Sequence, residues 1–320
     1  MERSTQLSLK NHSRETSKPK TPLNMNPTDE YFLRTLLVSL FVGVGTALIG
    51  VHLFLRRLLI LGLVMPQVSL LGGLLILWIT PLLRFTEKET QGGQTDSIWA
   101  LTFAGALIAS IPIAFWIGIK RHLRGLPIEV ILGTVYVLGV GGSLLLTALG
   151  PHALDHVPKL FQGQILAVTG WDLIILMATL GIASAFLIAN HRTLFAVGID
   201  SEFTLAIGHH VTVYETLFLT TASVVMSVAS VTVGPALVFA YSVCPVLGAW
   251  FLSLSVKTFV TLALLFAAVC GTGGTVIAFE LDLPVGSIQL VVLALGTITS
   301  GLLSRWLFHV SWLRKGKTQN

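Results

Sequence analysis

The chain has 320 residues, of which 53% are hydrophobic and 11% are charged, and its formal net charge is +5. Ordinary soluble domains contain roughly a quarter charged residues, so this composition excludes a soluble enzyme. Uncharged stretches such as Leu36 to Leu55 and Leu173 to Ala189 are long enough to cross a bilayer core as helices. The sequence therefore predicts an all-α, polytopic integral membrane protein.

The apolar runs predict eight or nine transmembrane helices, with nine as the working count. The predicted ranges are 31–55, 58–83, 97–119, 126–149, 170–190, 214–232, 235–253, 257–279 and 285–308. They form one transmembrane domain at 31–310, followed by a basic tail at 311–320. Residues 1–30 are polar and basic, and they lack the apolar core of a cleavable signal peptide, so we expect a disordered tail.

Basic residues near the span ends predict the orientation, because loops rich in Lys and Arg stay in the cytoplasm. With nine spans, one side carries Arg56, Arg57, Lys120, Arg121, Arg124, Arg192, Lys257, Arg305, Arg314, Lys315 and Lys317. We expect this side to be cytoplasmic, which places the basic N-terminal tail outside. The net charge is then a topology signal, and no nucleic-acid partner is expected.

Few residues inside the predicted spans are candidates for metal binding, redox chemistry or a polar pathway. Cys244 and Cys270 lie in apolar segments, where small buried side chains are expected rather than a redox pair or soft metal ligands. Ser223, Ser227, Ser230 and Gly234 share one helix face, which predicts either a helix contact or a pathway lining. Both interpretations remain open from the sequence.

The chain contains no P-loop of the G-x-x-x-x-G-K-[ST] type and no G-x-S-x-G or H-E-x-x-H pattern. If ATP drives this protein, another chain must bind the nucleotide. We expect no cofactor in this chain and no covalent chemistry.

A polar interruption runs from Asn190 to Thr212 on the predicted cytoplasmic side. Asp200 and Glu202 can start a short amphipathic helix that ends at Gly208, with its apolar positions at Phe203, Leu205, Ala206 and Ile207. Such a helix either rests on lipid headgroups or docks a soluble partner.

His152, Asp155 and His156 form H-x-x-D-H in the predicted external loop between the fourth and fifth spans. On a helical turn these positions share a face, so two imidazoles and a carboxylate could bind a divalent ion such as zinc. A solvated loop after Pro151 is the alternative. The triplet is a candidate for external metal capture.

Four segments in order resemble one family. They are FLRRLLILGLVMPQVSLLGG at 54–73, LFQGQILAVTGWDL at 160–173, the stretch at 198–253 with Val233, Gly234, Leu237, Val238 and Pro245, and DLPVGSIQL at 282–290. Together they resemble the permease subunit of ABC importers for zinc, manganese and iron, over about residues 31 to 308. The ordered set is more specific than any single segment.

The resemblance implies a type II ABC importer-like permease in the inner membrane of a bacterium. It implies a homodimer of permeases, a cytoplasmic ABC ATPase and an extracytoplasmic substrate-binding protein. The segment with Glu202, Phe203, Ala206 and Gly208 would be the ATPase-coupling element.

One departure from the family bears on the cargo. The family's early motif has an Asp and a His that face the metal pathway, and here the matching positions are Leu63 and Gln67. Leucine cannot ligate a metal, and an amide is a weak ligand for zinc. We expect a neutral pathway with Met65, Gln67, Ser223 and Ser227.

The departure leaves three interpretations of the function. The cargo is a transition-metal ion whose ligands lie elsewhere, at His52 or in H-x-x-D-H. Alternatively, the same machine moves a non-metal solute or a metal chelate. In the third interpretation, the chain is a membrane scaffold without transport.

Overall fold

The computed structural model describes residues 27–82, 94–120, 127–149 and 170–317, which form helices and no strand. The long helices are α1 (Pro27–Leu55), α2 (Leu61–Leu82), α3 (Gln94–Lys120), α4 (Ile128–Leu149), α6 (Gly170–Ala189), α9 (Val211–Val233), α10 (Pro235–Leu252), α11 (Val256–Glu280) and α12 (Val285–Lys317). Two short helices, α7 (His191–Ile199) and α8 (Ser201–Ala206), join α6 to α9.

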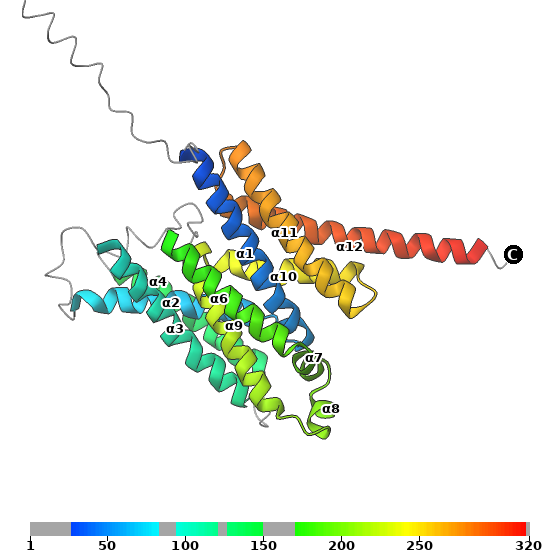
Figure 1. The fold of residues 1–320 in the computed structure, drawn as a ribbon, viewed down its shortest axis with the longest axis horizontal. Helices are drawn as coiled ribbons and strands as arrows, with labels where there is room; N and C mark the ends of the chain where they lie inside the picture. Colours follow the sequence, from blue (N-terminus) through cyan, green and yellow to red (C-terminus); the bar gives the residue numbers. More distant parts are fainter. Residues whose placement is uncertain (1–26, 83–93, 121–126, 150–169, 318–320) are drawn as a thin grey trace, which may run out of the picture.

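Nine of the described helices are long and apolar enough to cross a membrane. This confirms the predicted all-α polytopic fold, and every predicted span matches one helix (Figure 1). The main differences in bounds are at the ends, since α1 begins at Pro27 and α12 continues to Lys317. Apolar runs do not include the polar residues of the terminal turns of a helix, so the prediction from hydropathy is shorter at these ends. Pro27 and the acidic residues after it are nevertheless typical of the first turn of a helix. Residues 1–26, most of the predicted N-terminal tail, and residues 318–320 lie outside the described residues, whereas residues 311–317 of the predicted C-terminal tail belong to α12.

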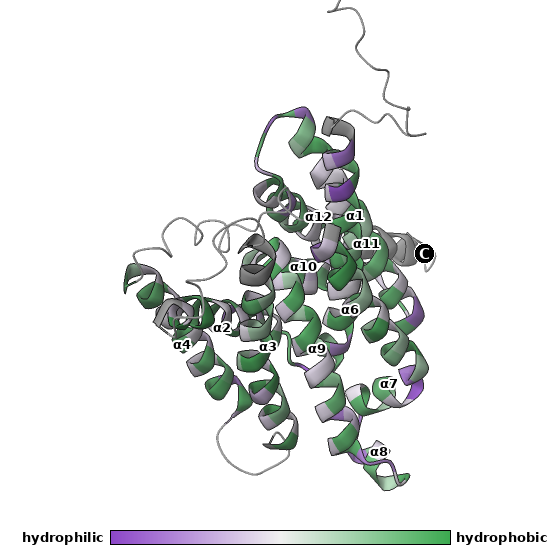
Figure 2. Ribbon diagram, turned by 60° about the vertical axis from the view of Figure 1, so that its left-hand side comes forward, coloured by the Kyte–Doolittle hydropathy of each residue, from purple (hydrophilic) through white to green (hydrophobic). Residues whose placement is uncertain are grey.

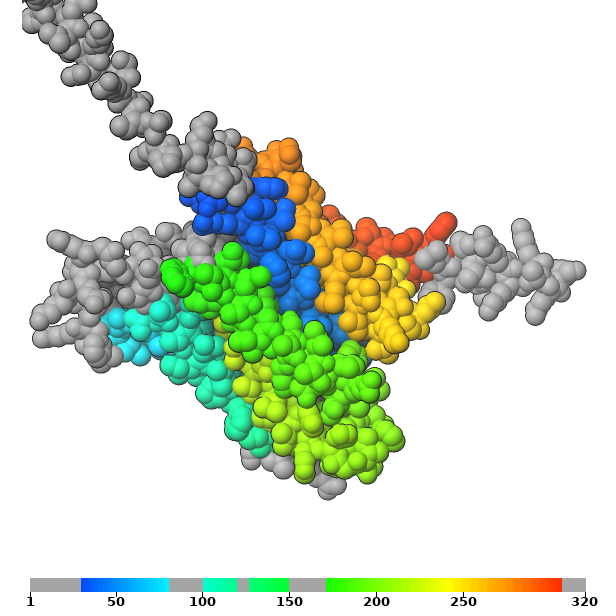
Figure 3. Space-filling view, in the orientation of Figure 1, coloured from blue at the N-terminus to red at the C-terminus, as the bar shows by residue number. Residues whose placement is uncertain are grey.

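α9 lies at the centre of the bundle. In its span 72% of the residues are buried, against 17% in α4. α9 packs against α2, α3 and α6, while α1 packs against α10 and α11, and α10 packs against α12. In Figure 3 the surface of α1 is flanked by α6 and α11. The polar face of α9 therefore lies inside the protein rather than in lipid.

The helix α9 stops at a buried break. Gly234 has φ +88° and ψ +151°, a conformation open essentially to glycine alone, and Pro235 is the first residue of α10. The proline lacks the N–H that a first helical residue would leave unpaired. The predicted separation of the two spans at this point is confirmed.

Close helix approaches depend on small residues, as expected for packing in lipid. A Cβ on Gly72 of α2 would lie 2.3 Å from the carbonyl oxygen of Gly105 on α3, and one on Gly105 would lie 2.4 Å from that of Gly72. The two backbones therefore touch at this crossing.

A buried polar network links α1, α11 and α12. Gln289 Nε2 donates to Ser39 Oγ and to Thr275 Oγ1, both at 2.7 Å, and to the carbonyl oxygen of Gly271 at 3.2 Å. Hydrogen bonds of this kind join transmembrane helices without any apolar driving force.

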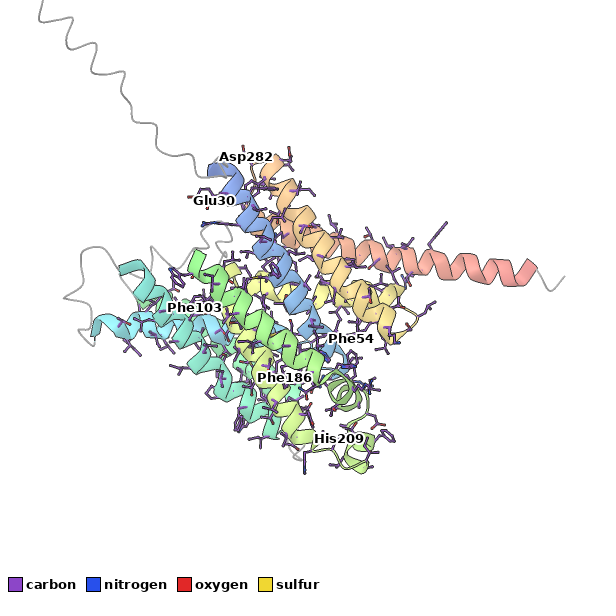
Figure 4. The ribbon with its side chains drawn as sticks, viewed as in Figure 1. Glu30, Phe54, Phe103, Phe186, His209 and Asp282 are labelled. Carbon is purple, nitrogen blue, oxygen red and sulfur yellow. The ribbon has the colours of Figure 1, made fainter. Side chains whose placement is uncertain are left out.

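The bundle has two distinct ends. Glu30 and Asp282 lie at one end and His209 at the other (Figure 4), and hydrophilic residues in Figure 2 gather near these ends and at the connections. At the His209 end, the Phe54 ring contacts the tilted rings of Trp250 and Phe259, with ring centroids 4.9 and 5.5 Å away. The ends of α1 and α10 and the start of α11 therefore meet on the side that carries α7 and α8.

Candidate functional site

A row of hydroxyl groups follows one face of α9 through the middle of the bundle. We call it the hydroxyl row, and its members are spaced by three or four residues: Thr216, Thr220, Ser223, Ser227 and Ser230. Side chains at this spacing share a helix face. The row extends the serine face predicted from the sequence toward the end of α9 that follows α8.

Ser227 joins three helices. Its Oγ donates to the carbonyl oxygen of Ser223 at 2.7 Å and lies 2.7 Å from Ser69 Oγ of α2 and 2.6 Å from Ser110 Oγ of α3. Each hydroxyl has one proton and can also accept, so either serine can be the donor in the bonds of Ser227 to Ser69 and to Ser110. These bonds explain Ser227 as a helix contact. No sequence pattern predicts the roles of Ser69 and Ser110, which are single serines in apolar runs.

Other hydroxyls of the row have no such partner. The oxygens of Thr216, Thr220 and Ser223 are buried and accept or donate no hydrogen bond within the described part of the chain. Ser230, in contrast, donates to the carbonyl oxygen of Pro66 at 3.1 Å. Buried hydroxyls without partners are uncommon, and they indicate sites for water or for a polar solute. The hydroxyls of Thr216, Thr220 and Ser223 are therefore available for hydrogen bonds with water or a polar solute.

The structure separates Gln67 from the hydroxyl row. Met65 is fully buried, and its carbonyl oxygen accepts a bond from Ser69, which faces α9. Gln67 is half-buried and borders α4, where a Cβ on Gly139 would lie 3.4 Å from Gln67 Cβ. Leu63, also half-buried, is one turn before Gln67 on the same face. Met65 and Gln67 therefore lie on different sides of α2, and Gln67 Oε1 is buried with no hydrogen-bond partner among the described residues.

The predicted external metal site lies outside the described residues, because His152, Asp155 and His156 fall in the gap at 150–169. In the part of the chain that the structure describes, no three His, Cys, Asp or Glu side chains gather as metal ligands. His52 is buried between two aromatic rings, with centroids 4.7 Å from Phe195 and 5.6 Å from Phe218.

The predicted amphipathic helix after Asp200 is present as α8. Asp200 caps it, because its side chain accepts a hydrogen bond from the Phe203 backbone N–H at 2.9 Å. Thr204 is buried and donates to the carbonyl oxygen of Asp200 at 2.7 Å. Gly208, with φ +91°, ends the turn in the left-handed region that favours glycine.

α8 is uncovered around most of its circumference, with Thr204 as its buried residue, and much of the exposed surface is apolar. Phe203, Leu205 and Ile207 are 61%, 63% and 55% exposed. Glu202, Ala206 and Gly208 are exposed as well. All four predicted coupling residues, Glu202, Phe203, Ala206 and Gly208, therefore lie on the surface, on the helix α8 or just after it, at the far end of the bundle from the start of α1 (Figure 1).

The model of the ABC 3 transport family matches residues 28–303. The chain belongs to this family. The match covers all nine candidate spans except the last residues of α12. The chain is thus a multi-pass permease of an ABC transporter in the bacterial inner membrane, and the predicted resemblance is confirmed.

Relatives of this ABC 3 family permease agree in length as well as in type. The chain is 25% identical to a "Probable iron transport system membrane protein" of Haemophilus influenzae, over 86% of this chain and 90% of the relative. It is 24% identical to the "Chelated iron transport system membrane protein YfeC" of Yersinia pestis, over 83% of each. The solved structure of PsaBC from Streptococcus pneumoniae in complex with Fab shares the fold, with a TM-score of 0.66 at 18% identity over 84% of this chain and 90% of that one.

Proposed function

We propose that this ABC 3 family permease imports a transition-metal ion, with iron, manganese and zinc as the candidates. The observation that carries the proposal is the family match over nearly the whole transmembrane domain. Two relatives of similar length, named for the transport of iron and of chelated iron, support the metal cargo.

The ATP-driven step belongs to a partner in this proposal. The chain carries no P-loop, so a cytoplasmic ABC ATPase binds and hydrolyses ATP, and the permease itself needs no cofactor and is not an enzyme. An extracytoplasmic binding protein delivers the cargo. Closure of the ATPase pair then moves the coupling elements and reopens the permease to the other side of the membrane.

The α8 face supports docking of the ATPase. Phe203, Leu205 and Ile207 expose apolar surface at the end of the bundle, and a soluble partner with a groove would remove that surface from water. Thr204 and the Asp200 cap hold α8 as a preformed helix, which lowers the ordering cost of binding. An interfacial helix resting on headgroups would expose the same residues to lipid instead.

We propose that residues of two helices, α2 and α9, line the transport pathway. Ser223 and Ser227 belong to the hydroxyl row on α9, while Met65 and Gln67 lie on different sides of α2, and Gln67 borders α4 rather than the row. The unpartnered oxygens of Ser223 and Gln67 support contact with a polar solute. Such neutral ligands would bind a metal ion weakly, which favours release of the ion during transport.

Two copies of the permease would complete the transporter. α4 is the least buried of the nine candidate spans. Cβ atoms added at its glycines Gly133 and Gly141 would meet nothing within 4 Å. Open glycines on a peripheral helix permit the close approach of another helix, which supports a homodimer.

A metal chelate is the second candidate cargo, and a specific observation favours it. Leu63 and Gln67 occupy the positions that match the family's Asp and His, so a bare ion meets no anionic or imidazole ligand on this face of α2. A chelate brings its own ligands and needs only neutral contacts from the protein.

Uptake in a deletion strain tests the cargo. We expect loss of this gene to slow growth under starvation for one of iron, manganese or zinc, and to lower uptake of that radioactive metal. Supplying the metal as the free ion or as a preformed chelate separates the two candidates. Unchanged uptake of all three metals in both forms would contradict the metal proposal.

A further inference from the structure

Arg56 is a buried arginine at the cytoplasmic end of α1. Its side chain is 3% exposed, whereas its neighbour Arg57 is exposed. Arginine at the end of a membrane helix ordinarily extends its charged group into water, as Arg57 does. The burial of Arg56 therefore requires partners that replace water around the guanidinium group.

Three helices supply contacts to this guanidinium. Nη1 donates to the carbonyl oxygen of His52 on α1 at 3.1 Å, and Nη2 donates to that of Leu194 on α7 at 2.9 Å. The guanidinium carbon lies 4.1 Å from the centroid of the Phe218 ring on α9, a cation–π geometry. We call this group of contacts the Arg56 joint.

The Arg56 joint is closely packed on the side of α7. A Cβ on Gly198 would lie 3.2 Å from Arg56 Nη1 and 3.4 Å from Leu55 Cβ. One turn earlier on α7, the Phe195 ring lies 4.7 Å from the His52 ring. α7 therefore meets the end of α1 with little free space between them.

α7 is also directly continuous with α8. Asp200 ends α7, since its backbone N–H donates to the carbonyl oxygen of Ala196, and the same residue caps α8 through its side chain. With a single residue between them, a displacement of α8 is carried to α7. Figure 1 shows the two helices together at the end of the bundle, below the end of α1.

We propose that Arg56 is a positioning residue that transmits the movement of the α7–α8 element to α1 and α9. This inference rests on the proposed docking of an ATPase at α8. α9 carries the hydroxyl row, so the Arg56 joint connects the coupling element to the candidate pathway. α1 packs on α10 and α11, which extends the connection to the other half of the bundle.

The geometry requires arginine rather than any cation. The planar guanidinium reaches two carbonyl oxygens with separate N–H groups while one of its faces covers the Phe218 ring. A lysine ammonium keeps the charge but cannot serve both carbonyls and the ring in this arrangement. Arg56→Lys is thus the informative change, and Arg57→Lys is its matched control at the adjacent exposed position.

The test uses the complete transporter, purified with its ATPase and reconstituted in lipid vesicles. Spin labels at Leu33 on α1 and Leu138 on α4, both exposed, report the distance between these helices by pulsed electron resonance. Cys244 and Cys270 are replaced by serine in the labelled protein, and labelled copies are diluted with unlabelled ones. The distance is measured without nucleotide and with trapped ATP.

In the unsubstituted protein we expect a shift of the label distance when ATP is trapped. Arg56→Lys should reduce this shift by about half or more, and lower manganese uptake per ATP hydrolysed by about fivefold, because the link to α7 is loosened. Assembly with the ATPase and the rate of ATP hydrolysis should stay within about twofold. Arg57→Lys should behave like the unsubstituted protein, and Gly198→Ala should weaken the shift in the same direction as Arg56→Lys.

Three results would overturn the inference. They are a full shift in Arg56→Lys, no ATP-dependent shift in the unsubstituted protein, and loss of the ATPase complex in Arg56→Lys, which would assign Arg56 to folding or docking. Failure of the cargo proposal looks different. In that case the label distance responds to ATP and to Arg56→Lys as expected, but the vesicles take up no manganese, iron or zinc.

Discussion

Single hydroxyl groups hold the centre of this bundle together. Ser227 bonds to α2 and α3 at once, and Ser230 reaches the backbone of α2 at Pro66. In lipid such bonds replace the apolar driving force that joins helices in water. Ser223 differs, because its hydroxyl is buried without a hydrogen-bond partner among the described residues.

Replacing Ser227 tests the contact interpretation. Ser227→Ala removes the hydroxyl that bonds to Ser69 and Ser110, and should lower the free energy of unfolding by about 1 kcal/mol. Melting of the purified protein in detergent measures this, with Ser287→Ala at an exposed position of α12 as the control. Unchanged melting combined with a loss of uptake would place Ser227 in the pathway instead.

Gln67 and Leu63 test the neutral pathway. Gln67→Ala removes an amide that borders α4 and should reduce uptake severalfold without loss of assembly. Leu63→Asp supplies a carboxylate one turn away and should increase retention of zinc on the purified permease. Metal content after gel filtration and initial uptake rates are the measurements. If both variants match the unsubstituted protein in both measurements, this face of α2 does not line the path.

Single residues could be predicted where their spacing in the sequence matches the period of a helix or the motif of a family. The serine face follows from helical periodicity, and Leu63 and Gln67 follow from the resemblance. The sequence predicts Arg56 as a topology marker, because a basic residue at a span end satisfies the orientation rule. Its acceptor on Leu194 is 138 residues away in the sequence, and no local pattern predicts that pairing.

The helices themselves follow closely from hydropathy and from helix end signals. The predicted start of α8 at Asp200 and its stop at Gly208 match the observed cap and the left-handed glycine. Gly234 before Pro235 marks the break between α9 and α10. The packing of these helices could not be predicted, since small residues such as Gly72 and Gly105 occur throughout the chain and only some lie at crossings.

Gly234→Ala tests the break. A Cβ in this backbone conformation is strained, so the variant should lose about 1–3 kcal/mol of stability. Gly181→Ala on α6 is the matched control, because its Cβ meets nothing within 4 Å and its helical backbone accepts alanine. Thermal melting of the two variants compares them. Equal melting would mean that the bundle does not depend on this break.

The docking face of α8 has its own test. Phe203→Ser removes an exposed apolar side chain from the face and should reduce the amount of co-purified ATPase by about tenfold. Leu254→Ser is the control, since Leu254 is 94% exposed at the connection between α10 and α11, on the same side of the bundle. An undiminished complex with Phe203→Ser would contradict docking at α8.

The whole molecule is a helical bundle with two distinct ends, and its low content of charged residues predicts a membrane protein. The fold, the helix count and the family could all be predicted from the sequence, because bilayer thickness and an ordered set of segments constrain them strongly. The cargo could not, because Leu63 and Gln67 replace the residues on which the family comparison depends. The pairing of two copies also depends on surfaces that only an assembled complex covers.

The central claim is that this permease moves a metal through the membrane when its partner hydrolyses ATP. The most direct test encloses ATP in vesicles that hold the permease with its ATPase, and supplies the binding protein with radioactive iron, manganese or zinc outside. We expect one of these metals, as the ion or as a chelate, to accumulate with ATP but not with a non-hydrolysable analogue. Equal accumulation of every metal with and without hydrolysis would contradict the claim.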